Sequence, residues 1–301
     1  MRLPLVFMDG PYRPTMGLRN LDLADWLWLD ERLAADVTER RRLVQERPDE
    51  VLAVRPGAEP ACRELLEMLV AWLPRHAPAH YAAAGEALLV RATGDRVSAE
   101  DREPLRRAGL LVQEDLCLMG RGADGAYRLE AAHLCFPSHW RLHDKLGRPL
   151  REIHAPVPVV RDRLAEPIDR FFATLAPERP VWRANWSLVE SPAPFHPGPR
   201  VPDPLLSADN AGERLWLRVE RQTLRRLPVS GFVLFTIRTL IRPLGEVARQ
   251  EGVAVAMAAR LREMPEAMAR YKGLPLMAGP VLGFLDRVAA GGSVAPAPQH
   301  P

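Results

Sequence analysis

The chain has 301 residues, which is long for one domain but within the range of a single large mixed fold. Its 41 basic and 38 acidic residues leave a net charge of only +3, too small for a nucleic-acid-binding footprint. Three scattered cysteines exclude a disulfide framework, no apolar run reaches the length of a membrane span, and the first 14 residues lack a signal-peptide pattern. We therefore expect a soluble cytoplasmic protein without a nucleic-acid or membrane partner.

Short strands and amphipathic helices are interleaved along the chain, which predicts an α+β fold. The first helix has Asn20 and Asp22 as candidate caps, and the second ends before Pro74. Helical spacing of apolar residues predicts helices at 18–47, 59–75, 162–176, 245–262 and 280–288. Alternating or β-branched runs predict strands at 87–91, 110–113, 116–119, 127–136, 182–189, 215–220 and 232–237.

A glycine-rich segment at 120–125 spells G-x-G-x-x-G. A dinucleotide-binding loop of this form leads into a helix, whereas this segment leads into a predicted strand. We therefore interpret it as a hairpin turn.

Two proline-rich loops could carry function. The loop at 136–158 holds His139 and His154 among prolines that fix the backbone, so His154 could ligate a metal or could simply cap the loop by hydrogen bonds. The loop at 191–210 is long for a compact domain, so it could cover a site or join subunits of an oligomer.

Arginines concentrate in and around the last two predicted strands, which join through a turn containing Pro228 and Gly231. The planar guanidinium matches carboxylates and phosphates, so the cluster indicates a dianionic ligand; the alternative is a set of solvated surface arginines. A heme would use a histidine for its iron, aromatic walls and arginines for its two propionates. The cluster comprises Arg218, Arg221, Arg225, Arg226, Arg238 and Arg242, with Glu220 as its one acid.

Several strings in the chain resemble one family, the heme-dependent oxidative N-demethylase alpha subunits. The most specific string is Arg-Val-Glu-Arg-Gln-Thr-Leu-Arg-Arg-Leu-Pro at 218–228. The others are Asn-Trp-Ser-Leu at 185–188, Ile-His-Ala-Pro-Val-Pro at 153–158 and Tyr-Lys-Gly at 271–273, and the resemblance covers most of residues 1 to 280.

The resemblance implies a heme b in a PAS-like fold, an antiparallel sheet core with flanking helices. It also implies oxidative demethylation of a small secondary amine such as dimethylamine, using O2 and electrons from a separate flavin and iron–sulfur reductase. We expect one heme-binding domain at 1–289 and a disordered tail at 290–301.

Site residues follow from the same resemblance. His154 is preferred over His139 as the iron ligand, and Cys135 as a thiolate ligand is the alternative. Glu220 is expected to attract a protonated amine, or else to pair with a neighbouring arginine. Trp186, Arg221, Arg225, Arg226 and Arg238 are expected in the heme site, with Arg221 and Arg238 also stabilising charge that develops on oxygen during catalysis.

Two rival functions stay open at this point. One is a non-catalytic heme or small-ligand sensor that keeps a PAS-like pocket. The other is a basic interaction module that has lost its cofactor, and such a protein would be colourless.

Overall fold

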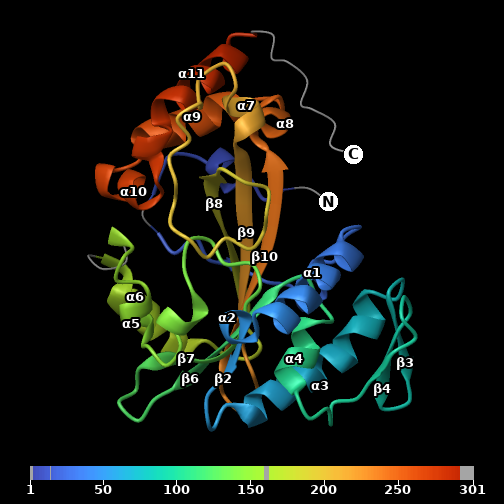
Figure 1. Cartoon of the computed structure of the whole chain (residues 1–301). Coiled ribbons are helices and arrows are strands. Elements are labelled where there is room, and N and C mark those ends of the chain that lie inside the picture. Colours follow the sequence, from blue (N-terminus) through green and yellow to red (C-terminus); the bar gives the residue numbers. More distant parts are fainter. Residues whose placement is uncertain (1–2, 14, 159–162, 292–301) are drawn as a thin grey trace.

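The structure is a computed structural model that describes residues 3–13, 15–158 and 163–291. It contains a seven-stranded antiparallel sheet in the order β1-β8-β9-β10-β6-β7-β2 and a separate three-stranded sheet β3-β4-β5, with helices around both (Figure 1). The predicted α+β fold, an antiparallel sheet core with flanking helices, is confirmed.

The bounds of the elements are as follows. The strands are β1 (Arg19–Asn20), β2 (Leu52–Val54), β3 (Tyr81–Ala84), β4 (Ala87–Val90), β5 (Arg96–Val97), β6 (Asp115–Arg121), β7 (Tyr127–His133), β8 (Val181–Val189), β9 (Trp216–Arg226) and β10 (Val233–Pro243). The α-helices are α1 (Leu33–Glu46), α2 (Pro48–Val51), α3 (Glu59–His76), α4 (Pro104–Gly109), α5 (Leu150–Ile153), α6 (Ala165–Thr174), α7 (Ala211–Arg214), α8 (Leu244–Ala248), α9 (Val253–Glu263), α10 (Glu266–Tyr271) and α11 (Ala278–Ala289). Short 3-10 helices lie at η1 (Val6–Met8), η2 (Leu23–Asp25), η3 (Leu142–Asp144) and η5 (Leu274–Leu276).

The β9–β10 hairpin is the longest part of the sheet and runs through the whole molecule (Figure 1). Its turn is closed by the Leu227 amide, which donates to Phe232 O at 2.8 Å, and Gly231 adopts a φ of 73° that favours glycine. The predicted turn is confirmed, but both strands are longer than predicted. The alternation continues past Glu220, with Arg221 and Thr223 buried on one face.

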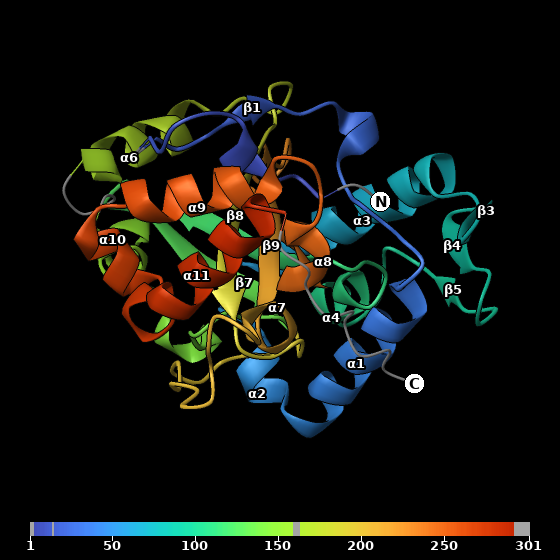
Figure 2. The same cartoon turned by 90° about the horizontal axis from the view of Figure 1, so that it is seen from above.

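Hydrophobic cores cover the two faces of this sheet unequally. On the face that carries Val219 and Leu234, α3 and α4 pack at one end of the hairpin, and α7, α8, α9 and α11 pack at the other (Figure 2). On the opposite face, α5 and α6 pack over Leu224 and Ile237 at one end only. The other end of that face carries polar side chains instead, because Glu220 and Gln222 share the strand face of Leu224.

Two predicted helices begin or end elsewhere than expected. Residues 19–25 form β1 and η2, because the Asp22 carboxylate accepts from the Ala24 amide and caps a 3-10 turn there; the α-helix starts only at Leu33. The second helix continues through Pro74 to His76, since a proline in the last turn removes only one donor.

The other boundary errors also have local causes. Residues 110–113 are a turn after α4 and not a strand, and the buried Gln113 side chain hydrogen-bonds to Asp30 and Asp36. The helix predicted at 245–262 is split into α8 and α9 at Gly252, whose φ is 72°.

Further predictions are confirmed or fall partly outside the described residues. The 120–125 segment is a hairpin turn, in which the Gly122 amide donates to Ala126 O at 2.8 Å. The strand predicted at 127–136 ends at His133, and α11 contains the predicted helix at 280–288. Residue 162 of the predicted 162–176 helix and residues 292–301 of the predicted tail lie outside the described residues. No described helix is long and apolar enough to cross a membrane.

Candidate functional site

The uncovered end of the sheet carries a group of polar side chains at the same register. Arg183 pairs with Gln222, and Asn185 pairs with Glu220, so all four project from one face of β8 and β9. Lys272 reaches this group from the end of α10. We call Arg183, Asn185, Glu220, Gln222 and Lys272 the β8–β9 polar cluster.

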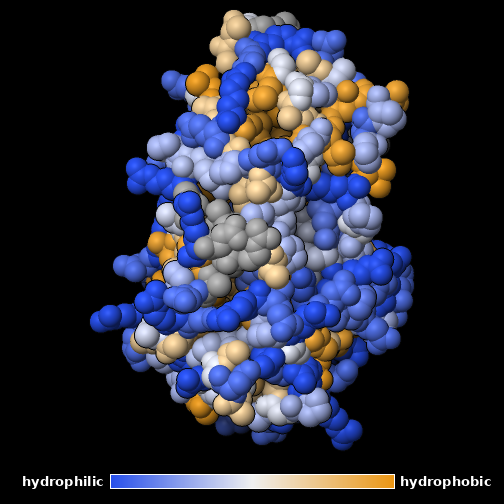
Figure 3. All heavy atoms as spheres, turned by 90° about the vertical axis from the view of Figure 1, so that its left-hand side faces the viewer, coloured by the Kyte–Doolittle hydropathy of each residue, from blue (hydrophilic) through white to orange (hydrophobic). Residues whose placement is uncertain are grey.

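The elements beside this cluster are α5, α6 and α10, on the left of Figure 1. Figure 3 views the molecule from that side: hydrophilic residues cover most of it, and hydrophobic residues show mainly toward the C-terminal helices. Each cluster side chain is only partly buried, although the cluster lies in mid-strand. Polar groups in that position are suited to contact a ligand.

Glu220 is the negative centre of the cluster. Arg218 Nε donates to its Oε1 at 3.0 Å, and Gln222 Nε2 donates to its Oε2 at 3.1 Å. The Glu220 side chain is 16% exposed, so it is not fully enclosed. The pairing with a neighbouring arginine is therefore present.

Lys272 has an unusual protonation equilibrium. Its Nζ donates to Asn185 Oδ1 at 3.1 Å and to the Trp186 carbonyl. Burial lowers the pKa of Lys272 to about 8; the Glu220 charge opposes this, and the Arg183 charge adds to it. Both protonation states are therefore populated near pH 8, as proton transfer requires.

His154 directly follows α5 and is held in one tautomer. Its Nδ1 lies 3.0 Å from Leu150 O, so Nδ1 carries the proton and donates. Burial lowers the pKa of His154, and the charges of Arg183 and Lys145 lower it further, so the ring is neutral at pH 7. Its Nε2 has no hydrogen-bond partner among the described residues. A neutral imidazole with a fixed Nδ1–H and a free Nε2 lone pair is the form that ligates metals.

Arg183 is the cation of the cluster that makes no hydrogen bond or ion pair with a described residue. Burial lowers its pKa and Glu220 opposes the shift. Its Nε is buried without a partner, and the guanidinium makes no hydrogen bond to any described residue. An arginine with free donors, close enough to affect the pKa of His154, can bind an anion at the same site.

Comparison with known families identifies the chain. The family described as Haem-dependent oxidative N-demethylase, alpha subunit-like matches residues 17–282. The chain belongs to this family. The matched stretch contains β8, β9, α5 and α10, hence the whole cluster and His154. The family name supports dependence on heme and a place in a multi-subunit enzyme.

In this N-demethylase family member, the arginines predicted at the anion site divide between the two sheet faces. Arg226 shares the face of Glu220, whereas Arg221, Arg225 and Arg238 lie on the opposite face. One ligand cannot contact both faces of a sheet. The propionate contacts were predicted to come from this set, and the strand register means that Arg226 and the other three arginines cannot serve the same ligand.

Most of these guanidinium groups bind protein atoms. Arg226 donates to Leu175 O and to the Tyr127 hydroxyl at 2.9 Å, and so ties the end of α6 to the sheet. Arg221 donates to Trp26 O at 3.1 Å, and Arg238 pairs with Asp30 at 2.9 Å. These contacts anchor the amino-terminal segment to the far face of the sheet.

The space beside Arg238 is also small. The cavity there has a volume of about 210 Å³, below the ~300–1,000 Å³ of typical ligand pockets. Arg225 stacks over the Trp26 ring at 4.7 Å and makes no hydrogen bond to a described residue, but it too lies on the face away from Glu220.

Trp186, Cys135 and His139 each have other surroundings. Trp186 packs its ring against Phe7, at 5.1 Å between centroids, within the core under α9 and α11. Cys135 is fully buried, and burial raises its pKa to about 12, which keeps the thiol protonated and disfavours a thiolate ligand. His139 lies beside Glu190 and His196.

Sequence reasoning missed Arg183, Lys272 and the role of Gln222. The strand at 182–189 was predicted, and its alternation already places Arg183, Asn185 and Ser187 on one face. No local pattern predicted that Lys272 joins this cluster, because Lys272 follows α10 and lies 87 residues from Asn185 along the chain.

Proposed function

We propose that the chain is the heme-binding oxygenase subunit of an oxidative N-demethylase. It acts on a small, dimethylamine-like amine, using O2 and electrons from a separate flavin and iron–sulfur reductase. The observation that carries the proposal is that His154, whose Nε2 bonds to no described residue, lies close enough to Arg183 for the arginine charge to lower its pKa, while Arg183 makes no hydrogen bond to a described residue. Family membership supports the heme dependence.

These residues fit a heme b. His154 would hold the iron, and Arg183 would bind a propionate with the donors that no described residue uses. Arg226 shares that face but donates to protein groups, while Arg221, Arg225 and Arg238 lie on the other face. We therefore assign the propionate contact to Arg183 in preference to those four.

Sheet topology supports a PAS-like site. The β6–β7 hairpin and the β8–β9–β10 meander are joined through α5 and α6, and β10, the last strand of this five-stranded unit, pairs with β6, the first strand of the unit. A PAS-like fold binds its ligand on the sheet face that these connecting helices share. His154 directly follows α5, and the β8–β9 polar cluster lies on the same face, next to the end that α5 and α6 cover. Since β9 and β10 run through all the cores of the sheet, we also propose that residues 1–289 form one domain.

When bound, the heme supplies the redox iron at which O2 oxidises the amine. The chain's own residues bind the substrate and move its proton. Glu220 attracts the ammonium form of the amine through its half-shielded carboxylate. Neutral Lys272, populated because of its lowered pKa, accepts the proton and leaves the amine with a free lone pair.

The test is turnover in a reconstituted system. Protein from heme-supplemented cells is supplied with an electron donor, O2 and dimethylamine or related amines, and formaldehyde is measured. We expect formaldehyde from wild type and at least a tenfold loss in kcat/KM for Glu220→Gln, which removes the charge that binds the ammonium. A heme spectrum that responds to ligands without formaldehyde from any amine would support the sensor instead.

A further inference from the structure

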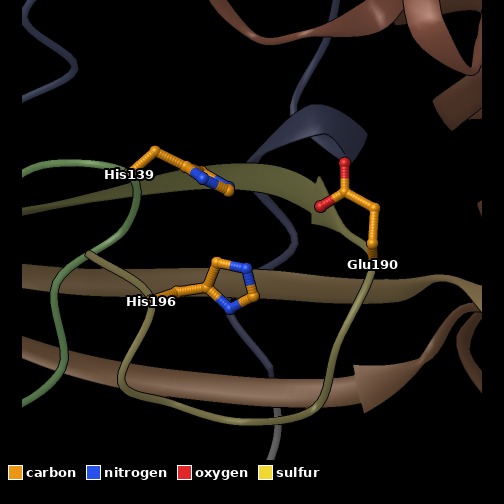
Figure 4. Close-up of side chains that lie close together, drawn as sticks. All are labelled: His139, Glu190 and His196. Carbon is orange, nitrogen blue, oxygen red and sulfur yellow. The ribbon is translucent and has the colours of Figure 1, made fainter. Parts of the chain in front are cut away.

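Three side chains at the edge of the sheet converge on one point outside the proposed heme site (Figure 4). His139 lies in the segment after β7, Glu190 directly follows β8, and His196 lies in the proline-rich loop that comes next. Their ligand atoms all lie within 4.8 Å of one another. Two imidazoles and one carboxylate are a ligand set that Zn²⁺ accepts, with a water in the fourth position.

His139 is prepared as a ligand. Its Nδ1 lies 3.0 Å from Gly198 O and donates to it, while its Nε2 is buried and has no hydrogen-bond partner. A buried, unpaired ring nitrogen is costly unless a ligand satisfies it. His139 also has a φ of 60°, unusual for a residue other than glycine, and it is the only such residue among those described.

The backbone holds the two histidines together. The His139 amide donates to His196 O at 2.6 Å, and the His196 amide donates to Pro137 O at 3.1 Å, which forms a parallel bridge between the two loops. The rings then meet edge to face, with centroids 5.0 Å apart. The His196 ring makes no hydrogen bond to a described residue, so its nitrogens are free to bind.

Arg200 fixes the third ligand. It donates to Leu188 O at 2.8 Å and reaches Glu190 Oε1 at 3.4 Å, which leaves the other carboxylate oxygen for a cation. Its charge opposes a cation, but an outer partner that orients a ligating carboxylate is common in metal sites. Tetrahedral zinc ligands are about 3.4 Å apart for Zn–N bonds of about 2.0 Å, so small side-chain rotations close the site.

We propose that His139, Glu190 and His196 bind one Zn²⁺ per chain, with water as the fourth ligand. The ion pins the loop at 191–210 to the segment after β7. Arg218 already links the same two segments, since it donates to Pro194 O at 3.2 Å and to Phe136 O at 2.6 Å. The zinc is therefore a second link between these two segments, beside the contacts of Arg218.

The test is zinc affinity of the full-length protein. After removal of metals with a chelator, Zn²⁺ is added back against a chromophoric competitor, and zinc and heme contents are both measured. We expect one Zn²⁺ per wild-type chain and a loss of affinity of at least a hundredfold in His196→Ala, with heme content unchanged. The matched control is His143→Ala, at a 57% exposed histidine outside the triad.

A second ligand variant distinguishes loss of zinc binding from a folding defect. Glu190→Gln preserves side-chain shape and should also weaken zinc binding, so a folding defect in one variant does not decide the outcome. Equal zinc affinity in wild type, His196→Ala and Glu190→Gln would overturn the proposal. Because heme content is recorded separately, failure of the zinc site leaves the heme assignment untouched.

Discussion

Lys272 gives a quantitative prediction, because its partly buried ammonium group makes stability depend on pH. Its pKa of about 8 in the folded chain lies below the usual 10.5, so between these values the unfolded chain binds more protons. Charged Lys272 therefore destabilises the folded chain below pH 8, and the free energy of unfolding increases as the pH rises from 8 to 10.5. Lys272→Met removes this dependence.

The magnitude follows from the two pKa values. At 1.36 kcal/mol for each unit of pKa difference, wild type should gain about 2 kcal/mol over Lys272→Met between pH 7 and pH 9.5. Partial exposure of Lys272 makes this an upper value, because water screens its charge.

The assay is urea unfolding of both proteins at pH 7 and pH 9.5. Arg270→Met on the same helix is the control, since Arg270 is 69% exposed and should show a difference that does not change with pH. A wild-type minus Lys272→Met difference that is equal at the two pH values would refute the lowered pKa, and with it the proton-acceptor role.

Three further predictions concern the buried groups and the heme contact. Asp115→Asn leaves Arg40 as an uncompensated buried charge, because both side chains are 0% exposed and pair at 2.9 Å; we expect a loss of about 3–5 kcal/mol in urea unfolding. Burial lowers the pKa of His133 to about 3. Wild type should therefore lose about 2 kcal/mol of unfolding free energy as the pH falls from 6.5 to 5, whereas His133→Gln should not. Parallel curves of stability against pH for the two proteins would contradict this. Arg183→Met should lower heme affinity at least tenfold while Arg225→Met, on the other face, leaves it unchanged; equal effects would reject Arg183 as the propionate contact.

Strand alternation made much of the sheet predictable. The β9–β10 hairpin and its turn were predicted because apolar and polar residues alternate at 215–220, before Pro228, and a continuous apolar or β-branched run at 232–237 follows Gly231. The length of the hairpin was not predicted, because the first predicted strand ended at Glu220, where arginines replace apolar residues. Arg221 is nevertheless buried, at 1% exposure, because the Trp26 carbonyl group of the amino-terminal segment accepts its hydrogen bond, whereas Arg225 and Arg226 are only partly buried.

The candidate site was only half predictable for the same reason. His154 and Glu220 could be selected from local residue types, but the division of the arginines between faces depends on strand register. Contacts between distant segments carry no local signal: Lys272 meets Asn185 across 87 positions, and His139 meets His196 only because two loops form a bridge.

The central claim is that His154 holds a heme on the polar face of β8 and β9. The most direct measurement is the ultraviolet–visible spectrum of protein from heme-supplemented cells, before and after dithionite and carbon monoxide, for wild type, His154→Ala and the control His143→Ala. We predict a Soret band that shifts with carbon monoxide in wild type and in His143→Ala, and a lost or altered band in His154→Ala. Normal heme content and an unchanged spectrum in His154→Ala would contradict the assignment, and a colourless wild type would contradict heme binding altogether.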